Sequence, residues 1–341
     1  MHQHDNGQEC PCARCFHGPH RLYIIGNGFD LHYGIKSSYR DFFSYLLETN
    51  PLPESLLTEY CQGDLWRDFE SGLGLIPESA FFANVFGILQ DNDADWDQIL
   101  TSWDAQALSI EQNFNASQIA RYFQEWVNQI DVSPAFDDGL IVDDEHTAFL
   151  SFNYTRTLED RLGIEQNRIL HIHGRSGDDD LVFGHAHLNI SEPRRLHDFS
   201  GQDTLEELRI KFIANTEKPV SRILSGKQGW FEQLSNLQEI IVAGFSFGKV
   251  DLPYIKKIVE MAPNARWAEY CYGPQKVSRN PYISTVKLLA YPNSTHDGVR
   301  RRTREPESAV NPEASPIYIL EEVAGWPART TTARVGRLDA I

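Results

Sequence analysis

The sequence lacks any apolar run near the ~20 residues that a membrane-spanning helix needs. Its first residues, MHQHDNGQECPCARC, also lack the apolar stretch of a secretory signal peptide. Cysteine is scarce: there are five, an odd number, and three of them, Cys10, Cys12 and Cys15, are crowded at one end. These absences argue against a secreted disulfide framework and predict a cytoplasmic protein with reduced thiols and no membrane partner.

Basic residues are also in short supply. The chain has 31 Lys and Arg against 48 Asp and Glu, which gives a formal net charge of −17. Nucleic-acid phosphates require a basic surface, so nucleic acid is not an expected partner. A small ligand fits this charge better. The oligomeric state is left open, and a homo-oligomer is compatible with the sequence.

With 341 residues, 41% of them hydrophobic, the chain can bury one large core or two modest ones. Residues 1–20 show no periodicity and are predicted to be a disordered extension. Residues 21–291 are predicted to form the folded domain. Periodicity weakens over residues 292–341, apart from PIYILEEV, so this segment is predicted to be a partly disordered tail.

Apolar patterns in residues 21–291 predict strands that alternate with helices. LYIIG is a short buried strand, and SYRDFFSYLLE after it has helical spacing. Residues 51–138 are predicted to be a helical insertion, with apolar stripes in LWRDFESGL, AFFANVFGIL, WDAQALSIEQNF and IARYFQEWVNQI. Further strands are predicted at TAFLSFNY, RILHIHG, LVFGH, EIIVAGFSF and RWAEYCYG, and helices at RTLEDRL and DLPYIKKIVEM. This alternation predicts an α/β fold with a mainly parallel sheet covered on both faces.

Ligands of such sheets bind beyond the carboxyl ends of the strands. After the first strand comes Gly26-Asn27-Gly28-Phe29-Asp30, where two glycines let the backbone approach a phosphate or ribose. After TAFLSF comes Asn153, which can hold a ribose hydroxyl or a water, although it or Thr155 could equally cap the next helix.

Histidines follow the next strand. Strand alternation places His171 and His173 on one face and Ile172 on the other, and a histidine at a strand end can act as a general base. With His185 and His187 nearby, a metal site is the alternative. No carboxylate or cysteine has a convincing ligand spacing, so no metal is expected.

The segment Gly244-Phe245-Ser246-Phe247-Gly248 follows a fourth strand and matches the GxSxG nucleophile elbow of serine hydrolases. That enzyme class needs a histidine after the serine. The one histidine downstream is His296, in a segment without clear strand character. A serine hydrolase therefore stays an alternative.

Six motifs in order resemble the AbiH family of bacteriophage abortive-infection proteins: IIGNGFDLHYGIKSSYRDF, LWRDFESGL, FLSFNYTRTLE, ILHIHG, LVFGH and IIVAGFSFGKVDLPYI. The likeness covers Arg21 to about Tyr291. It implies a role in antiphage defence, set off by a phage trigger that the sequence does not identify.

The same motif order is similar, more faintly, to the sirtuin-type core, which implies a Rossmann-like (sirtuin/DHS-type) sheet that binds NAD or a related nucleotide. The implied binding residues are Gly26, Asn27, Gly28, Phe29, Asp30, Gly244, Ser246 and Asp251. The implied catalytic residues are Asn153, His173 and Asp30. The four-cysteine zinc module of sirtuins is absent, which argues against protein deacylation, and Asp41-Phe42-Phe43 stands where sirtuins carry Asp-Phe-Arg.

Together these patterns favour an abortive-infection protein that binds NAD or a related nucleotide and cleaves its glycosidic bond as an NAD glycohydrolase. Asp30 and Glu70 are the carboxylates expected to stabilise positive charge on the ribose, unless Asp30 caps its helix and Glu70 lies on a solvated helix face. A nucleotide-binding sensor or scaffold without turnover is the alternative from a different functional class.

Overall fold

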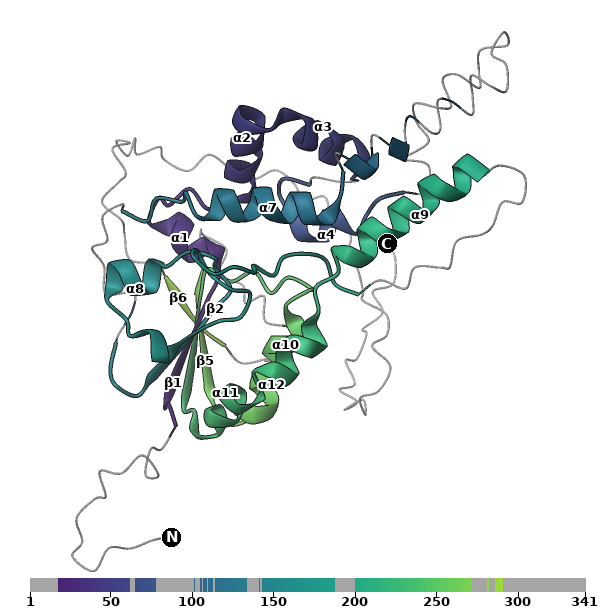
Figure 1. Ribbon diagram of the computed structural model, residues 1–341. Helices are drawn as coiled ribbons and strands as arrows, with labels where there is room; N and C mark the ends of the chain where they lie inside the picture. Colours follow the sequence, from purple (N-terminus) through teal and green to yellow (C-terminus); the bar gives the residue numbers. More distant parts are fainter. Residues whose placement is uncertain are drawn as a thin grey trace, which may run out of the picture. The chain divides into compact units, whose positions relative to one another are not determined.

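A computed structural model describes residues 18–61, 65–77, 101, 105, 107–108, 110–112, 114–133, 141, 143–187, 200–271, 281 and 286–290 (Figure 1). Four features of the sequence lie outside these residues: the cysteines before Gly18, AFFANVFGIL, His296 and the predicted C-terminal tail. In the described part of the chain, no helix is long and apolar enough to cross a membrane.

The centre of the fold is a six-stranded sheet in which every neighbouring pair of strands is parallel. The strands are β1 (Arg21–Ile25), β2 (Thr147–Ser151), β3 (Ile169–His171), β4 (Glu239–Ala243), β5 (Arg266–Cys271) and β6 (Val286–Ala290). They are arranged in the order β3-β2-β1-β4-β5-β6. The predicted α/β class and parallel sheet are confirmed, whereas β6 has no counterpart among the predicted strands.

The register of the central strands brings their carboxyl ends level. Ile25, the last residue of β1, pairs with Ser151 at the end of β2 and with Ala243 at the end of β4. The segments that follow these three strands therefore leave the sheet side by side. This places three segments at one edge of the sheet: residues 26–30, which we name the glycine loop, the segment that contains Asn153, and the segment that begins at Gly244.

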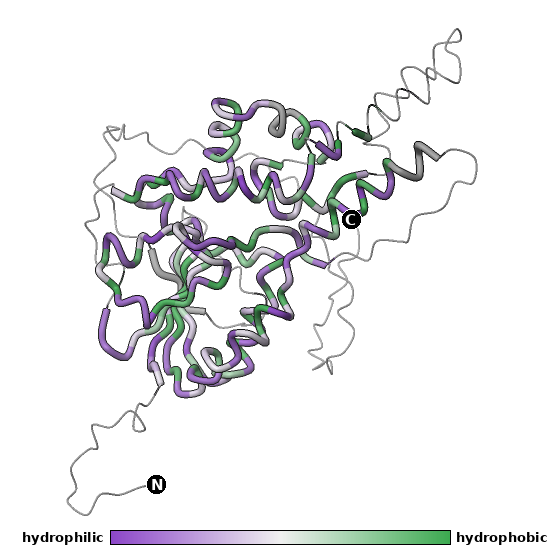
Figure 2. Tube along the Cα trace, in the orientation of Figure 1, coloured by the Kyte–Doolittle hydropathy of each residue, from purple (hydrophilic) through white to green (hydrophobic). Residues whose placement is uncertain are grey.

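Each face of the sheet packs against a separate hydrophobic core, because alternate strand residues point to opposite sides. Leu22 and Ile24 face α11 (Gln228–Glu232), η4 (Gln233–Asn236) and α12 (Leu252–Met261). Tyr23 and Ile25 face α1 (Asn27–His32) and α8 (Thr157–Leu162). Hydrophobic residues dominate the central strands in Figure 2, as expected for a sheet covered on both sides.

A third core lies in the helices beyond the sheet: α2 (Tyr39–Thr49), α3 (Pro51–Tyr60), α4 (Phe69–Leu73), α7 (Ala116–Val127) and α9 (Ser200–Asn215). Aromatic rings dominate it; the Phe42 ring packs edge-on against Phe69 and Phe123 at centroid distances of 5.4 and 5.3 Å. The start of α2 is fixed by a capping box between Ser38 and Asp41. Within residues 51–138, predicted to be a helical insertion, the described residues include α3, α4 and α7.

The predicted strand LVFGH is wrong. Residues 181–184 are irregular, and His185 forms only an isolated bridge with Glu217, in the segment between α9 and α10 (Val220–Gly226). Gly184 has φ +139°, and a Cβ there would lie 2.0 Å from the carbonyl oxygen of Thr216. This close backbone approach with a left-handed residue prevents a regular strand. The short helix η3 (Gln166–Arg168) precedes β3.

Candidate functional site

The glycine loop after β1 packs backbone to backbone against the segment after β4. The Gly28 amide donates a hydrogen bond to the Gly244 carbonyl at 2.9 Å. A Cβ on Gly26 would lie 2.5 Å from the Cα of Phe245, and one on Gly28 would lie 2.8 Å from the Cα of Gly244. Close packing of the two loops therefore explains both glycines without a ligand. Phe29 is fully buried in the core between the sheet and α1.

Asp30 points from α1 toward the segment after β2. Its side chain is fully buried, and its Oδ2 accepts a hydrogen bond of 2.6 Å from the Thr155 hydroxyl. Its Oδ1 has no hydrogen-bond partner among the described residues. Burial raises the pKa of Asp30 to about 6, although hydrogen bonds from Thr155 and its neighbours oppose this rise. Asp30 thus does not serve as a simple helix cap.

Asn153 is also buried, and neither its amide nitrogen nor its amide oxygen has a hydrogen-bond partner among the described residues. The following helix, α8, has Arg156 at its N-cap position, with no side-chain capping hydrogen bond. The alternative in which Asn153 or Thr155 caps this helix is therefore wrong. The Asn153 backbone is held by His171, whose Nδ1 lies 3.2 Å from the Asn153 carbonyl oxygen.

A cavity of about 60 Å³ joins these groups. It is lined by residues of the segments after β1 and β2 and of the helices beyond them: Asn27, Asp30, Ser37, Tyr39, Trp126, Ile130, Phe152, Asn153, Tyr154 and Thr155. The Ser37 hydroxyl donates to Asn27 Oδ1 at 2.6 Å. The lining combines aromatic rings, hydroxyl groups, amides and one carboxylate, and includes neither lysine nor arginine.

A second polar cluster adjoins the cavity. The ammonium of Lys218 lies 2.9 Å from Glu70 Oε1 and 3.4 Å from Asp251 Oδ1, and the Lys218 side chain is completely buried. Tyr154, which lines the cavity, has its hydroxyl 3.2 Å from the same Glu70 oxygen. Tyr254 lies beside this cluster with a buried hydroxyl that has no described partner. We name Glu70, Lys218 and Asp251 the lysine cluster.

The alternative in which Glu70 lies on a solvated helix face is wrong, because α4 turns this side chain toward Lys218 and away from water. The sequence did not indicate Lys218, which lies outside every motif. Asp251, an implied nucleotide-binding residue, has its carboxylate engaged by Lys218. Burial raises the Asp251 pKa to about 7, although Lys218 opposes this rise.

The predicted placement of His171 and His173 on one face is wrong. Strand β3 ends at His171, so strand alternation does not extend to His173. His171 faces α8, where its Nε2 lies 3.3 Å from Glu159 Oε1. His173 faces α12, with its Nε2 3.5 Å from Asp251 Oδ1 and its ring against Tyr254. Burial, and secondarily Lys218, hold the His173 pKa well below 6.5.

His173 does not line the cavity. Its ring packs against Phe152 and Tyr154, which do. The predicted role of His173 as a general base stays a prediction, and this geometry does not favour it.

Ser246 is exposed and makes no hydrogen bond to another described residue. A nucleophile elbow requires the serine to sit in a strained turn directly before a helix. Here the residues with positive φ are Gly244 and Phe247, and α12 does not begin until Leu252. The segment after β4 thus matches the elbow in sequence and not in conformation.

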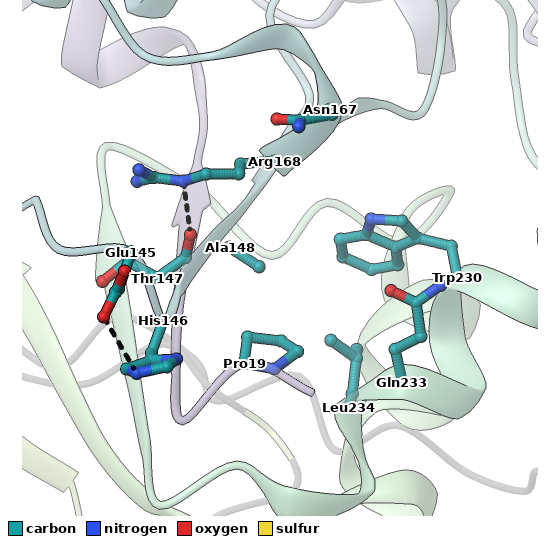
Figure 3. Close-up of a pocket in the computed structure, with 10 residues that line it drawn as sticks. All are labelled: Pro19, Glu145, His146, Thr147, Ala148, Asn167, Arg168, Trp230, Gln233 and Leu234. Atoms are coloured by element: carbon teal, nitrogen blue, oxygen red, sulfur yellow. Dashed lines mark hydrogen bonds and ion pairs between the residues drawn. The ribbon is translucent and has the colours of Figure 1, made fainter. Parts of the chain in front are cut away.

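A larger pocket, of about 260 Å³, lies at the opposite edge of the sheet, near the amino ends of β1, β2 and β3. Figure 3 shows Trp230 and Gln233 on one side of it and His146 and Arg168 on the other. Arg168 Nε donates a hydrogen bond to the Thr147 carbonyl oxygen at 3.1 Å. None of the residues predicted to act on a ligand lines this pocket.

Among the described residues, no group of three or more His, Cys, Asp or Glu is placed to hold a metal ion. The family model described as "Bacteriophage abortive infection AbiH" matches residues 22–270. This range contains the whole cavity lining and the lysine cluster. No curated protein matches the chain.

Proposed function

The chain belongs to the AbiH family of bacteriophage abortive-infection proteins, and from this premise we propose that it acts in phage defence by binding the ribosyl part of a nucleotide at the cavity. Its ligand in this proposal is NAD or a related nucleotide. Hydrolysis of the glycosidic bond is the reaction that fits the site residues best.

The observation that carries the proposal is a set of buried polar atoms without partners at one cavity. Asp30 Oδ1 and both amide atoms of Asn153 make no hydrogen bond of normal geometry to a described residue, although the Asn153 side chain lies close enough to Asp30 to lower its pKa. Leaving a buried polar atom unpaired costs about 1–3 kcal/mol, so such atoms indicate a missing partner. A carboxylate and an amide together offer acceptors and a donor, which suit the adjacent hydroxyl groups of a ribose.

The strand order also supports this ligand class, and the cavity volume limits which part of the ligand it can hold. The order β3-β2-β1-β4-β5-β6 is that of doubly wound dinucleotide-binding sheets, which bind ligands where the strand order reverses. In this sheet that point lies between β1 and β4, and the cavity lies beside it, between the segments after β1 and β2. The cavity of about 60 Å³ is far smaller than the ~300 Å³ or more of pockets that enclose a whole ligand, so we assign to it only the hydroxyl edge of the ribose.

In the proposed hydrolysis, the bond between ribose C1′ and the nicotinamide nitrogen breaks, and its electron pair leaves with nicotinamide. A water oxygen bonds to C1′, and its proton passes to Asp30. A pKa of about 6 leaves Asp30 ionised at neutral pH, yet more basic than an exposed carboxylate. The same negative charge stabilises the positive charge that develops on the ribose, while Asn153 orients the water.

The test is incubation of the purified protein with NAD, with nicotinamide release followed by chromatography and NAD binding by calorimetry. We expect Asn153→Asp and Asp30→Asn to abolish release. The matched controls are Asn167→Asp and Asp160→Asn, which make the same changes at exposed positions and should retain wild-type release.

Binding of NAD without release would assign the protein to the sensor or scaffold class. Absence of both binding and release, in the presence and absence of phage lysate, would reject the nucleotide proposal and leave the family assignment unchanged.

A further inference from the structure

The motif LVFGHAH has no part in the proposed chemistry. Its histidine His185 instead forms hydrogen bonds with the segment that carries Lys218. The His185 amide donates to the Thr216 carbonyl at 3.0 Å, and the Lys218 amide donates to the His185 carbonyl at 2.9 Å. The His185 ring is buried, with its Nε2 2.9 Å from the Ile213 carbonyl oxygen. These bonds fasten the segment that carries Lys218.

A lysine at position 218 is not explained by packing alone. Its side chain has no exposed surface, and it faces two carboxylates, Glu70 and Asp251. Moving charges out of water costs several kcal/mol per ion, and apolar residues of similar size often replace a buried ion pair without loss of stability. A cluster with one cation and two carboxylates retains a formal net charge of −1, which further disfavours a purely structural role.

Glu70 contacts a residue that lines the cavity, and Asp251 contacts His173, whose ring packs against two lining residues, Phe152 and Tyr154. Glu70 meets the hydroxyl of Tyr154, whose ring lines the cavity, and its charge raises the pKa of Tyr39, a second lining residue, after burial itself. Asp251 lies 3.5 Å from His173 Nε2. Lys218 is therefore one contact removed from the cavity wall and one contact removed from His173.

We propose that Lys218 is the positioning residue of this site: it holds Glu70 against Tyr154 and Asp251 against His173, and balances part of their charge. Lys218 does not touch the cavity, so it acts through the two carboxylates. The inference rests on the proposed function only in treating the cavity as the ligand site.

The charge states of the cluster support this role. Burial lowers the pKa of Lys218, but Glu70 and Asp251 outweigh it and the net shift is upward, so the lysine stays charged. The pKa of Asp251 is about 7, whereas the pKa of His173 lies well below 6.5, so His173 is the neutral member of this pair at neutral pH. Besides Lys218, the charged groups that act on Asp251 are Glu70 and Asp68, and both raise its pKa. Without Lys218, the Asp251 carboxyl group would favour its protonated form, because Lys218 opposes the rise in its pKa.

The experiment uses the full chain in a bacterial host and with a phage against which the wild type protects. Lys218→Met should abolish protection, so that plaque numbers rise to those of a host without the protein. Lys211→Met, the same change at an exposed position of α9, should leave plaque numbers at the wild-type level. Urea unfolding of each purified variant reports stability separately.

Two double variants separate positioning from folding. Lys218→Met with Glu70→Gln, and Lys218→Met with Asp251→Asn, both keep the formal cluster charge of the wild type. We expect them to recover most of the urea midpoint lost in Lys218→Met while protection stays absent. Recovery of protection together with stability in either double variant would show that the cluster is only structural and would overturn the proposal.

If a double variant does not fold, the single variant Glu70→Gln decides the question. It leaves Lys218 paired with Asp251, and a folded Glu70→Gln protein that still protects would overturn the proposal. Because phage protection is the readout, this test is independent of nicotinamide release. A wild type without NAD turnover rejects the proposed reaction but not the role of Lys218.

Discussion

Lys218 Nζ lies 2.9 Å from Glu70 Oε1, although the two residues are 148 positions apart in the sequence. One comes from the segment after α9 and the other from α4 in the helical insertion. Their contact links the helices beyond the sheet to the carboxyl edge of the strands. There, Asp251 accepts a hydrogen bond from the same Lys218 ammonium group. The chemistry of this edge is therefore built by the insertion together with the sheet.

The buried carboxyl group of Asp30 should make stability depend on pH. Its pKa rises from 3.8 to about 6 on folding, so its contribution is fully present below pH 4 and is lost as the pH rises to about 6. We expect wild type to lose about 2 kcal/mol relative to Asp30→Asn between pH 4.5 and 7.5. Urea unfolding of both proteins at pH 4.5 and 7.5 measures the difference; equal pH dependence would contradict the assigned burial.

Replacing Gly244 should damage the fold and not merely a ligand contact. Gly244 has φ +68°, and a Cβ there would lie 2.0 Å from the Phe29 backbone nitrogen. We expect Gly244→Ala to lose about 3 kcal/mol or more of unfolding free energy, from strain and overlap together.

Gly163→Ala is the matched control for Gly244→Ala. Gly163 has φ +67° but open space around its Cβ position, so only the backbone strain of about 1–2 kcal/mol applies. Similar losses in the two variants would argue against the close contact between the glycine loops.

The hydroxyl of Tyr154 should contribute to stability. It lies 2.9 Å from the Val182 carbonyl oxygen and 3.2 Å from Glu70, so its removal leaves buried acceptors short of a donor. We expect Tyr154→Phe to lose about 1–3 kcal/mol. Tyr45→Phe removes only a half-buried contact of 3.5 Å to Glu125 and should change stability by less than about 0.5 kcal/mol. Urea unfolding of both variants provides the comparison.

Ser246 should be dispensable for phage defence. It is exposed and unpartnered among the described residues, and the turn that holds it lacks the conformation of a nucleophile elbow. We expect Ser246→Ala to protect as well as wild type and the wild-type protein to stay unlabelled by a fluorophosphonate probe. Labelling that disappears in Ser246→Ala would instead support serine hydrolase chemistry.

Local sequence signals were sufficient for β1 to β5 and for part of the site, although they missed β6 and wrongly predicted a strand at LVFGH. β1, β2 and β4 are short apolar runs buried on both faces, which is the pattern of a parallel sheet. Asp30 and Asn153 were predicted because they follow such runs directly, and the carboxyl ends of parallel strands meet at one edge. The extension of strand alternation to His173 failed because β3 ends two residues earlier.

By itself, the sequence determined the family, the α/β class and the segments that line the carboxyl edge, because each depends on local order and periodicity. Only the tertiary structure decided that Lys218, Glu70 and Asp251 meet, and that the glycines of two loops pack against each other. Lys218 lies outside every motif, and Glu70 occupies a helix whose burial is set by distant partners. The meeting of such side chains depends on strand register and helix packing, which no local pattern encodes.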